Sequence, residues 1–306
     1  MKKIETVNII GMGALGMTFG KIIADHAGYD RVTFVMDKER YEIHRKEEFH
    51  VNSERVNFRL SPPENAFAAD LVIVAVKYND LPAALDTIST SVGKRSTIIS
   101  LMNGIDSEEI IAERYGADRI VYAVAQGMDA THFGTEVTYS KPGEIIIGIT
   151  KREMSERLER LEEFFETVHV PYSVENDILR SMWGKFMLNC GVNQTCMVFG
   201  TGYGGALSEG SEARMVMISA MREVMLVARA ERVLLTEDDL MFYIELLEGM
   251  DPNACPSMGQ DRLNKKKSEV EMFAGVVKDL GKKWGIPVPA NEFLYKRVQK
   301  IESSYL

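Results

Sequence analysis

The stretch "TVNIIGMGALGMTFG", residues 6–20, decides the fold expected for the first half of this 306-residue chain. A short β-branched run ends directly in Gly11, and Gly13 and Gly16 follow before a segment of helical pattern. Glycines at this spacing permit a tight turn, the close approach of a pyrophosphate, and the packing of the helix against the strand. Free N–H groups at the start of the helix then face the phosphates. We therefore predict a dinucleotide site at this loop.

An acidic residue follows at the expected distance. Asp37 closes "RVTFVMD", about 20 residues past the last glycine, where a carboxylate can accept hydrogen bonds from the adenosine ribose of NAD. A solvated aspartate at a strand end is the simpler interpretation. Lys38 and Arg40 follow at once and could receive a 2′-phosphate instead. The local chemistry favours NAD(H) and leaves NADP(H) open.

Apolar runs and helical stretches alternate along the first half of the chain. Such an alternation predicts a parallel sheet that is covered on both faces. We expect strands over 6–10, 31–36, 71–76, 96–101 and 119–125, a hairpin over 136–148 that turns at 141–143, an amphipathic helix over 155–168, and a final strand over 169–174. Beyond about residue 175, long helical patterns replace the strands. The sequence thus predicts an α/β protein, with a Rossmann-type parallel sheet domain over 1–174 and an all-α domain over 175–306.

The composition indicates which kinds of partner the protein can bind and in which cellular compartment it works. The net charge of −9 argues against nucleic acid or an anionic membrane as a partner. Three cysteines without a CxxC pair indicate a reducing compartment, and the five histidines show no metal-ligand spacing, so we expect a cytoplasmic protein without a metal site. The methionines and leucines of the second half could line a homodimer interface or pack within the core.

A narrow polar stripe marks "SMWGKFMLNCGVNQ", residues 181–194, which is otherwise largely apolar. Lys185, Asn189 and Asn193 recur every fourth position, so a helix would place them along one side. Such spacing is typical of the solvated side of an amphipathic helix. However, apolar residues cover almost every other direction, and asparagine is a poor helix former on an exposed surface. We therefore favour a mostly buried helix whose ammonium stabilises the oxyanion left by hydride transfer and donates the proton.

Seven motifs in order resemble the ketopantoate reductase family (2-dehydropantoate 2-reductases) over essentially the whole chain. They are "NIIGMGALG", "DLVIVAVKYNDL", "SLMNGID", "WGKFMLNCGVNQ", "SMGQD", "KKKSEVEMFAG" and "GIPVPANEFLY". The resemblance implies a Rossmann domain, then a helical domain related to the C-terminal domain of 6-phosphogluconate dehydrogenase, with the substrate in the cleft between them. It implies reduction of a small 2-oxo acid, 2-dehydropantoate, to D-pantoate with NADP(H) in pantothenate biosynthesis.

The resemblance also assigns roles to individual residues. Lys185 becomes the general acid, and Glu269 lies near the substrate hydroxyl and the nicotinamide ribose, where it can orient Lys185. The substrate-binding residues implied are Asn189, Asn193, Ser257 and Tyr203. The cofactor-binding residues, those of the glycine loop included, are Gly11, Met12, Gly13, Ala14, Leu15, Gly16, Asp37, Lys38, Lys77, Asn103, Ala130 and Glu269. Without the resemblance, Ser257 could be a helix N-cap, Lys77 and Asn103 ordinary loop residues, and Glu269 a solvated residue of a charged helix.

Two positions depart from the family pattern. Asp37 stands where many members carry an arginine that binds the 2′-phosphate of NADP, and Tyr203 stands where the family often has an asparagine. Both departures fit relatives that reduce other branched or aromatic 2-oxo acids with NADH to D-2-hydroxy acids. A non-catalytic dinucleotide sensor is a third hypothesis, which the intact set of polar residues argues against.

Overall fold

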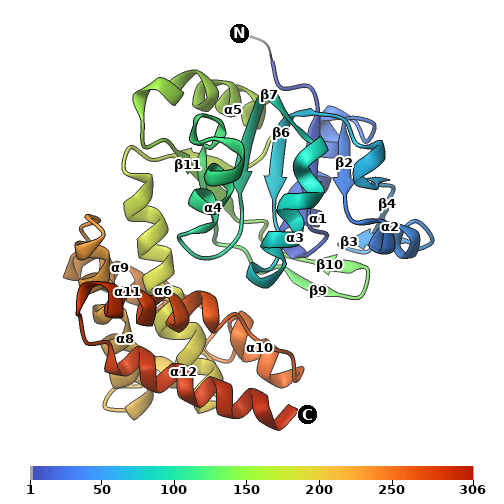
Figure 1. Ribbon diagram of the computed structural model, residues 1–306. Coiled ribbons are helices and arrows are strands. Elements are labelled where there is room, and N and C mark those ends of the chain that lie inside the picture. The colour runs from blue at the N-terminus through green and yellow to red at the C-terminus, as the bar shows by residue number, and fades with distance from the viewer. Residues whose placement is uncertain (1–2, 306) are drawn as a thin grey trace. The chain divides into compact units, whose positions relative to one another are not determined.

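The computed structural model describes residues 3–305, which divide into two compact units (Figure 1). The first unit ends at Ile178 and combines sheets with helices, and the second begins at Leu179 and is helical. The predicted class, an α/β fold with a parallel sheet followed by a helical region, is confirmed. None of the helices in the described part of the chain is long and apolar enough to cross a membrane.

A five-stranded parallel sheet forms the centre of the first unit. Its strand order is β5 (Arg59–Ser61), β2 (Val32–Val35), β1 (Val7–Ile10), β6 (Ala69–Val74) and β7 (Val92–Ser100). Every neighbouring pair is parallel, and Ile9 lies between Phe34 of β2 and Ile73 of β6. Parallel neighbours bring all carboxyl ends to one edge, so the loops that follow these strands share that edge.

Successive residues of the strands pack on opposite faces of this sheet, which explains their continuous apolar runs. On one face, Ile9 and Ile73 belong to a core with α1 (Ala14–Ala27) and α5 (Ser155–Thr167). On the other face, Ile10 and Val72 pack with α3 (Leu81–Thr87) and α4 (Ser107–Tyr115). The sheet is therefore buried on both sides, as the pattern predicts.

Two smaller sheets complete the first unit. One holds β8 (Tyr122–Gln126), β11 (Glu144–Gly148) and β12 (Tyr172–Val174), with β11 antiparallel to β8 and parallel to β12. The other has the order β4 (Glu54–Val56), β3 (Phe49–Val51), β10 (Glu136–Thr138) and β9 (Thr131–Phe133). The short elements are α2 (Lys38–His44), η1 (Pro63–Asn65), η2 (Tyr78–Asp80), η3 (Ile88–Thr90), η4 (Ala117–Arg119), η5 (Arg152–Met154) and η7 (Ser303–Tyr305).

The hairpin predicted over 136–148 is wrong, because its two strands lie in different sheets. β10 pairs with β9 across Gly134, which has a φ of 60°, whereas β11 pairs with β8. Gly143 has a φ of 71°, and a Cβ there would overlap the carbonyl oxygen of Gln126. The glycine therefore carries the chain past the end of β8 rather than closing a two-stranded turn.

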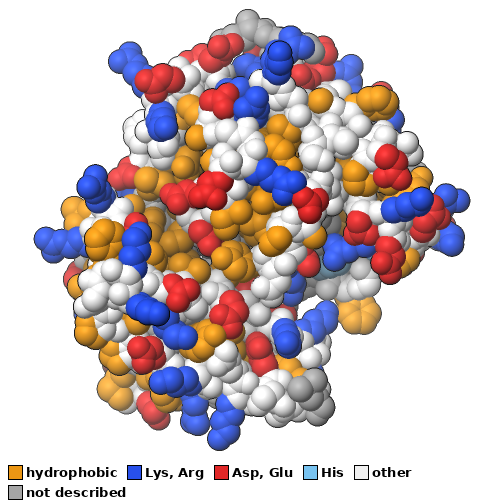
Figure 2. All heavy atoms as spheres, viewed as in Figure 1, with side chains coloured by type: hydrophobic (Ala, Val, Ile, Leu, Met, Phe, Trp, Pro, Cys, Tyr) orange, Lys and Arg blue, Asp and Glu red, His pale blue; other side chains and the backbone are white. Residues whose placement is uncertain are grey.

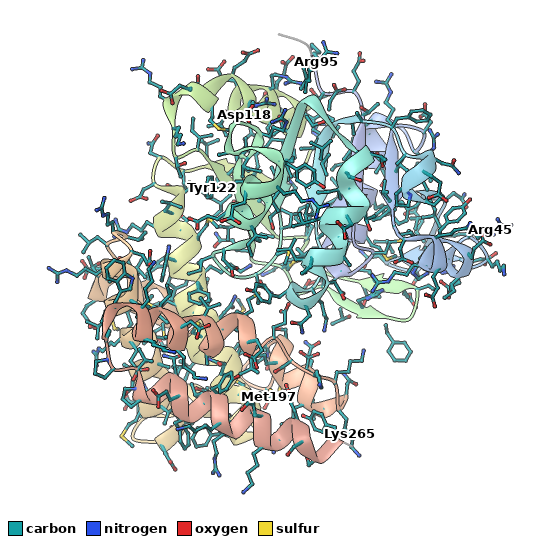
Figure 3. The ribbon with its side chains drawn as sticks, in the orientation of Figure 1. Arg45, Arg95, Asp118, Tyr122, Met197 and Lys265 are labelled. Carbon is teal, nitrogen blue, oxygen red and sulfur yellow. The ribbon has the colours of Figure 1, made fainter. Side chains whose placement is uncertain are left out.

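The second unit is built around one long apolar helix, α6 (Ile178–Phe199). Met197, near the end of this helix, is labelled in Figure 3. The other elements are α7 (Tyr203–Leu207), α8 (Glu212–Ala230), α9 (Glu237–Glu248), α10 (Ser257–Leu263), the π-helical turn η6 (Glu271–Gly275), α11 (Val276–Trp284) and α12 (Pro289–Glu302). Glu223 of α8 accepts the backbone N–H groups of Ala290 and Asn291 at 2.7 and 2.9 Å. A buried carboxylate therefore satisfies the first turn of α12.

Candidate active site

The glycine loop has the geometry that its spacing predicts. Gly11 has a φ of 107°, and a Cβ there would overlap the backbone of Ala75, while a Cβ on Gly16 would overlap the carbonyl oxygen of Gly11. A Cβ on Gly13 would instead point into open space, with no heavy atom of the described chain within 4 Å. Gly13 is also the N-cap of α1, and no side chain caps that helix. The loop therefore offers N–H groups and room to a phosphate group.

The other predicted cofactor residues gather at the same edge of the parallel sheet. Asp37 follows β2 and Lys77 follows β6, the two strands that flank β1, and Asn103 follows β7, the neighbour of β6. Lys77 is exposed and Asn103 is half-buried. Ala130 lies just before β9 and packs in one cluster with Met12 and Met17 of the glycine-loop region. The first unit thus brings the glycine loop, Asp37, Lys77, Asn103 and Ala130 to one side.

Asp37 has a structural role in addition to its predicted one. Its Oδ1 accepts the backbone N–H of Arg40 at 2.9 Å, which makes it the N-cap of α2. The Arg40 guanidinium lies 3.5 Å from Asp37 and 3.8 Å from Asp80. Arg40 is therefore paired with two carboxylates, while Lys38 is exposed on the first turn of α2.

The polar stripe of the second unit lies on α6, as expected. Every residue from Ser181 to Phe199 is buried or half-buried, so α6 is not an amphipathic surface helix. Asn189 and Asn193 are 9% and 5% exposed, and Asn193 Nδ2 donates to Asn189 Oδ1 at 3.3 Å. Buried amides keep their hydrogen-bonding groups satisfied, and this contact uses only part of the capacity of the two side chains.

Lys185 is half-buried on the same stripe. Burial lowers the pKa of Lys185 to about 8, and the nearby Glu269 carboxylate opposes that effect. Desolvation therefore outweighs the attraction of the carboxylate. An amine with a pKa near 8 is protonated at neutral pH and can still give up its proton, as a general acid requires.

Ser257 and Tyr203 lie on segments that are joined at the end of α6. Tyr203 N donates to Ala254 O at 3.1 Å, and Gly204 N donates to Pro252 O at 2.8 Å. Burial raises the pKa of Tyr203 to about 12, with smaller contributions from Cys196 and Cys255, so its hydroxyl stays neutral. Ser257 is exposed on the first turn of α10, where Pro256 and not Ser257 occupies the N-cap.

Two anchoring residues of this region were not predicted from the sequence. Arg262 of α10 donates from Nη1 to the carbonyl oxygens of Met197 and Val198, which ties α10 to the end of α6. Gln194, fully buried, links α6 to η6. Arg262 lies in a charged segment that resembles a solvated surface, and Gln194 lies beside the stripe but outside its spacing. No signal in the neighbouring sequence therefore marks either residue as an anchor.

Comparison with known proteins agrees with this arrangement. Two sequence profiles, described as "Ketopantoate reductase PanE/ApbA" and "Ketopantoate reductase PanE/ApbA C terminal", match residues 7–152 and 177–302. The chain belongs to the ketopantoate reductase family. It is 28% identical over 256 residues to a 2-dehydropantoate 2-reductase of Aquifex aeolicus, covering 78% of each chain. As a member of this family, the chain is an NAD(P)-dependent oxidoreductase.

Solved structures of other proteins show the same fold. A PanE/ApbA family ketopantoate reductase from Ralstonia eutropha JMP134 is 26% identical, with a TM-score of 0.83 over 98% of this chain and 99% of that one. A complex of D-mandelate dehydrogenase with NADH is 21% identical, with a TM-score of 0.88 over 98% of this chain and 100% of that one. The second likeness shows the fold alone.

Proposed function

We propose that the chain reduces 2-dehydropantoate to D-pantoate, with Lys185 as the proton donor. The single observation that carries this proposal is the half-buried Lys185, which lies on one stripe of α6 with Asn189 and Asn193 and interacts with Glu269. When bound, a reduced nicotinamide supplies the hydride. Lys185 Nζ stabilises the negative charge on the carbonyl oxygen and transfers a proton to it, so one hydride and one proton convert the ketone to an alcohol.

The remaining predicted residues would hold the two ligands. Asn189 and Asn193 would donate to the substrate through amides that carry no charge, and Ser257 would meet its carboxylate or hydroxyl. Glu269 would orient Lys185 and meet the nicotinamide ribose. The N–H groups at the start of α1 would bind the pyrophosphate beside Gly13, where the open space fits that group. Lys77, Asn103 and Ala130 would complete the cofactor site at the sheet edge.

The choice of nucleotide depends on two opposing observations. Membership of the ketopantoate reductase family supports NADP(H). Asp37 and Asp80 support NAD(H), because both carboxylates lie close to Arg40 and would repel a 2′-phosphate there. Lys38 remains the cation that could receive such a phosphate.

A second function is favoured by Tyr203 and by the same acidic pair. An NAD-dependent D-2-hydroxyacid dehydrogenase acting on other branched or aromatic 2-oxo acids would use the same Lys185 chemistry. Tyr203 places a neutral, half-buried ring in the segment that contacts the loop before Ser257. The D-mandelate dehydrogenase structure, solved with NADH, has the same fold, which supports this alternative.

The experiment compares kcat/KM for 2-dehydropantoate, 2-ketoisovalerate and phenylglyoxylate, each with NADPH and with NADH. A clear preference for 2-dehydropantoate supports the first function. A preference for either of the other two acids with NADH would replace it with the second. A protein that binds the cofactor but reduces no member of the panel would contradict both.

We also propose that the chain forms a homodimer through α8 and α9. Large hydrophobic side chains on and beside these helices are exposed: Met215, Leu226, Leu234, Met241, Phe242, Leu246 and Met250. Figure 2 shows hydrophobic side chains at the surface where α9 is drawn. Exposed apolar surface of this kind is typical of interaction sites. Light scattering should show a dimer that Phe242→Glu dissociates, and a wild-type monomer would contradict the proposal.

A further inference from the structure

A π-helical turn of the helical unit, η6, begins two residues after Glu269. Phe273 N donates to Glu269 O at 3.2 Å with the spacing of an α-helix, whereas Gly275 N donates to Val270 O at 3.0 Å with the spacing of a π-helix. The N–H of Ala274 lies between these two donors. Single π-turns are rare and occur often at functional sites.

Gln194 accepts a hydrogen bond from the N–H group of Ala274, for which this turn provides no backbone acceptor. Ala274 N donates to Gln194 Oε1 at 3.2 Å, and both residues are fully buried. At the other end of the same amide, Gln194 Nε2 donates to Cys190 O at 2.7 Å. The amide is therefore fixed in orientation by one donor and one acceptor. A buried N–H without a partner destabilises the fold, so the π-turn depends on this acceptor.

Glu269 lies between this turn and a second anchor. On its other side, Ser268 donates from its backbone N and its Oγ to Glu302 Oε1, at 2.8 and 2.6 Å. The rings of Phe186 on α6 and Phe273 on η6 also meet, with centroids 6.3 Å apart. Since Lys185 precedes Phe186, the packing of η6 against α6 determines where Glu269 lies relative to the ammonium.

We propose that Gln194 is a positioning residue, which stabilises the π-turn of η6 and thereby holds the Glu269 carboxylate against the Lys185 ammonium. This inference rests on the proposed role of Lys185 in reduction. It adds a residue that touches neither substrate nor cofactor and acts only through Glu269.

The test measures the pKa of Lys185 without turnover. Competitive labelling of the folded protein with acetic anhydride at several pH values, read by mass spectrometry of the Lys185 peptide, gives this pKa. A neighbouring carboxylate typically shifts a pKa by about 1–3 pH units. We expect both Glu269→Gln and Gln194→Leu to lower the pKa of Lys185, the latter by at least about half a pH unit. The double variant should show no more than the shift of Glu269→Gln alone.

Two variants separate positioning from general destabilisation. Leu240→Ala removes buried volume from α9 and should lower the melting temperature without changing the pKa of Lys185. Gln194→Glu keeps an oxygen acceptor for Ala274 N. Whether the new side chain is protonated or charged, this variant should not lower the pKa of Lys185. If Gln194→Leu leaves the pKa of Lys185 unchanged while Glu269→Gln lowers it, or if Gln194→Glu lowers it, the proposal is wrong.

Hydrogen exchange provides a readout that needs no labelled lysine. Gln194→Leu should accelerate exchange in the peptide that contains residues 270–276, and Leu240→Ala should not do so selectively. Unchanged exchange in that peptide would overturn the role of Gln194. Neither measurement requires substrate, so a chain that failed to reduce 2-dehydropantoate would refute the proposed function while leaving this inference to be judged by its own results.

Discussion

Asp37 Oδ1 accepts the backbone N–H of Arg40 at 2.9 Å, so the carboxylate that we propose as the ribose ligand also caps α2. A substitution that removes the whole Asp37 side chain also removes the N-cap of α2, and loss of the cap alone costs about 1 kcal/mol of stability. A serine at this position would keep the cap and remove the charge. The substitution Asp37→Ser therefore tests the proposed role in cofactor selection separately from the cap.

We expect Asp37→Ser to weaken NADH binding by about 10–100-fold, the loss of a charge-assisted hydrogen bond of about 1.5–3 kcal/mol. NADPH binding should weaken less or improve, because a negative charge leaves the neighbourhood of Arg40. Dissociation constants from fluorescence titration check the prediction. Asp37→Ala serves as the control, since it should show the same change in preference with an additional loss of thermal stability. Equal weakening for both nucleotides would exclude a selective role for Asp37.

Gly13 and Gly16 should respond to alanine in opposite ways. Gly13 has an extended backbone with a φ of −84°, and its Cβ would enter open space, so Gly13→Ala should fold normally and bind dinucleotide at least about tenfold more weakly. Gly16→Ala would press against the backbone of Gly11 and should destabilise the fold by about 1–3 kcal/mol. Thermal unfolding with and without nucleotide separates the two effects. Tight binding by Gly13→Ala would show that the pyrophosphate lies elsewhere.

The pH dependence of reduction follows from Lys185. Its pKa of about 8 means that the proton-donating form is lost as the pH rises through 8, so kcat/KM for reduction should fall about tenfold per pH unit above that value. The oxidation of the hydroxy acid needs the neutral amine and should rise over the same range. Removing the opposing carboxylate in Glu269→Gln should move the alkaline limb of the reduction profile to lower pH. A profile that stays flat from pH 7 to 10 would contradict the assignment.

Glu108, at the start of α4, should make the stability of the fold depend on pH, independently of catalysis. Burial raises the pKa of Glu108 from its ordinary 4.5 to about 7, against the opposing hydrogen bond from Ser107 Oγ at 2.8 Å. The folded state thus holds a proton that the unfolded state releases between these values, so this group stabilises the fold below pH 4.5 and loses that contribution as the pH rises to 7. The difference corresponds to about 3 kcal/mol. Calorimetry should find a smaller loss of stability from pH 5 to 7.5 in Glu108→Gln than in the wild type, and identical losses would disprove the protonated state.

Features with a local cause could be predicted from the sequence. The glycine loop can be recognised from a spacing of a few residues, and in the structure Gly11 and Gly16 have no room for a Cβ, whereas Gly13 faces open space. The α/β class follows in the same way from continuous apolar strands that pack on both faces. The prediction that α6 is mostly buried is confirmed, because its apolar residues leave only a narrow polar stripe.

Features that depend on contacts between distant segments could not be predicted. Glu136–Thr138 and Glu144–Gly148 look like the two strands of a hairpin, yet the first pairs with β9 and with β3, 86 residues earlier, and the second pairs with β8. The three-residue strands of the small sheet are too short for a periodic signal. The same limit applies to Gln194, whose partner Ala274 lies 80 residues away. The roles of Lys185, Asn189, Asn193, Ser257, Tyr203 and Glu269 stay predictions.

The most direct test of the central claim is the initial rate of 2-dehydropantoate reduction by Lys185→Ala and by the wild type, with cofactor affinity measured in parallel. Loss of one preorganised donor to an oxyanion typically costs about 2.7–4 kcal/mol, so we expect kcat to fall by at least about 10²–10³-fold. Cofactor affinity should stay within about twofold, because the predicted nucleotide contacts lie mainly in the first unit. Lys265→Ala, which changes an exposed lysine beyond α10, should behave as the wild type. Wild-type turnover by Lys185→Ala would contradict the account.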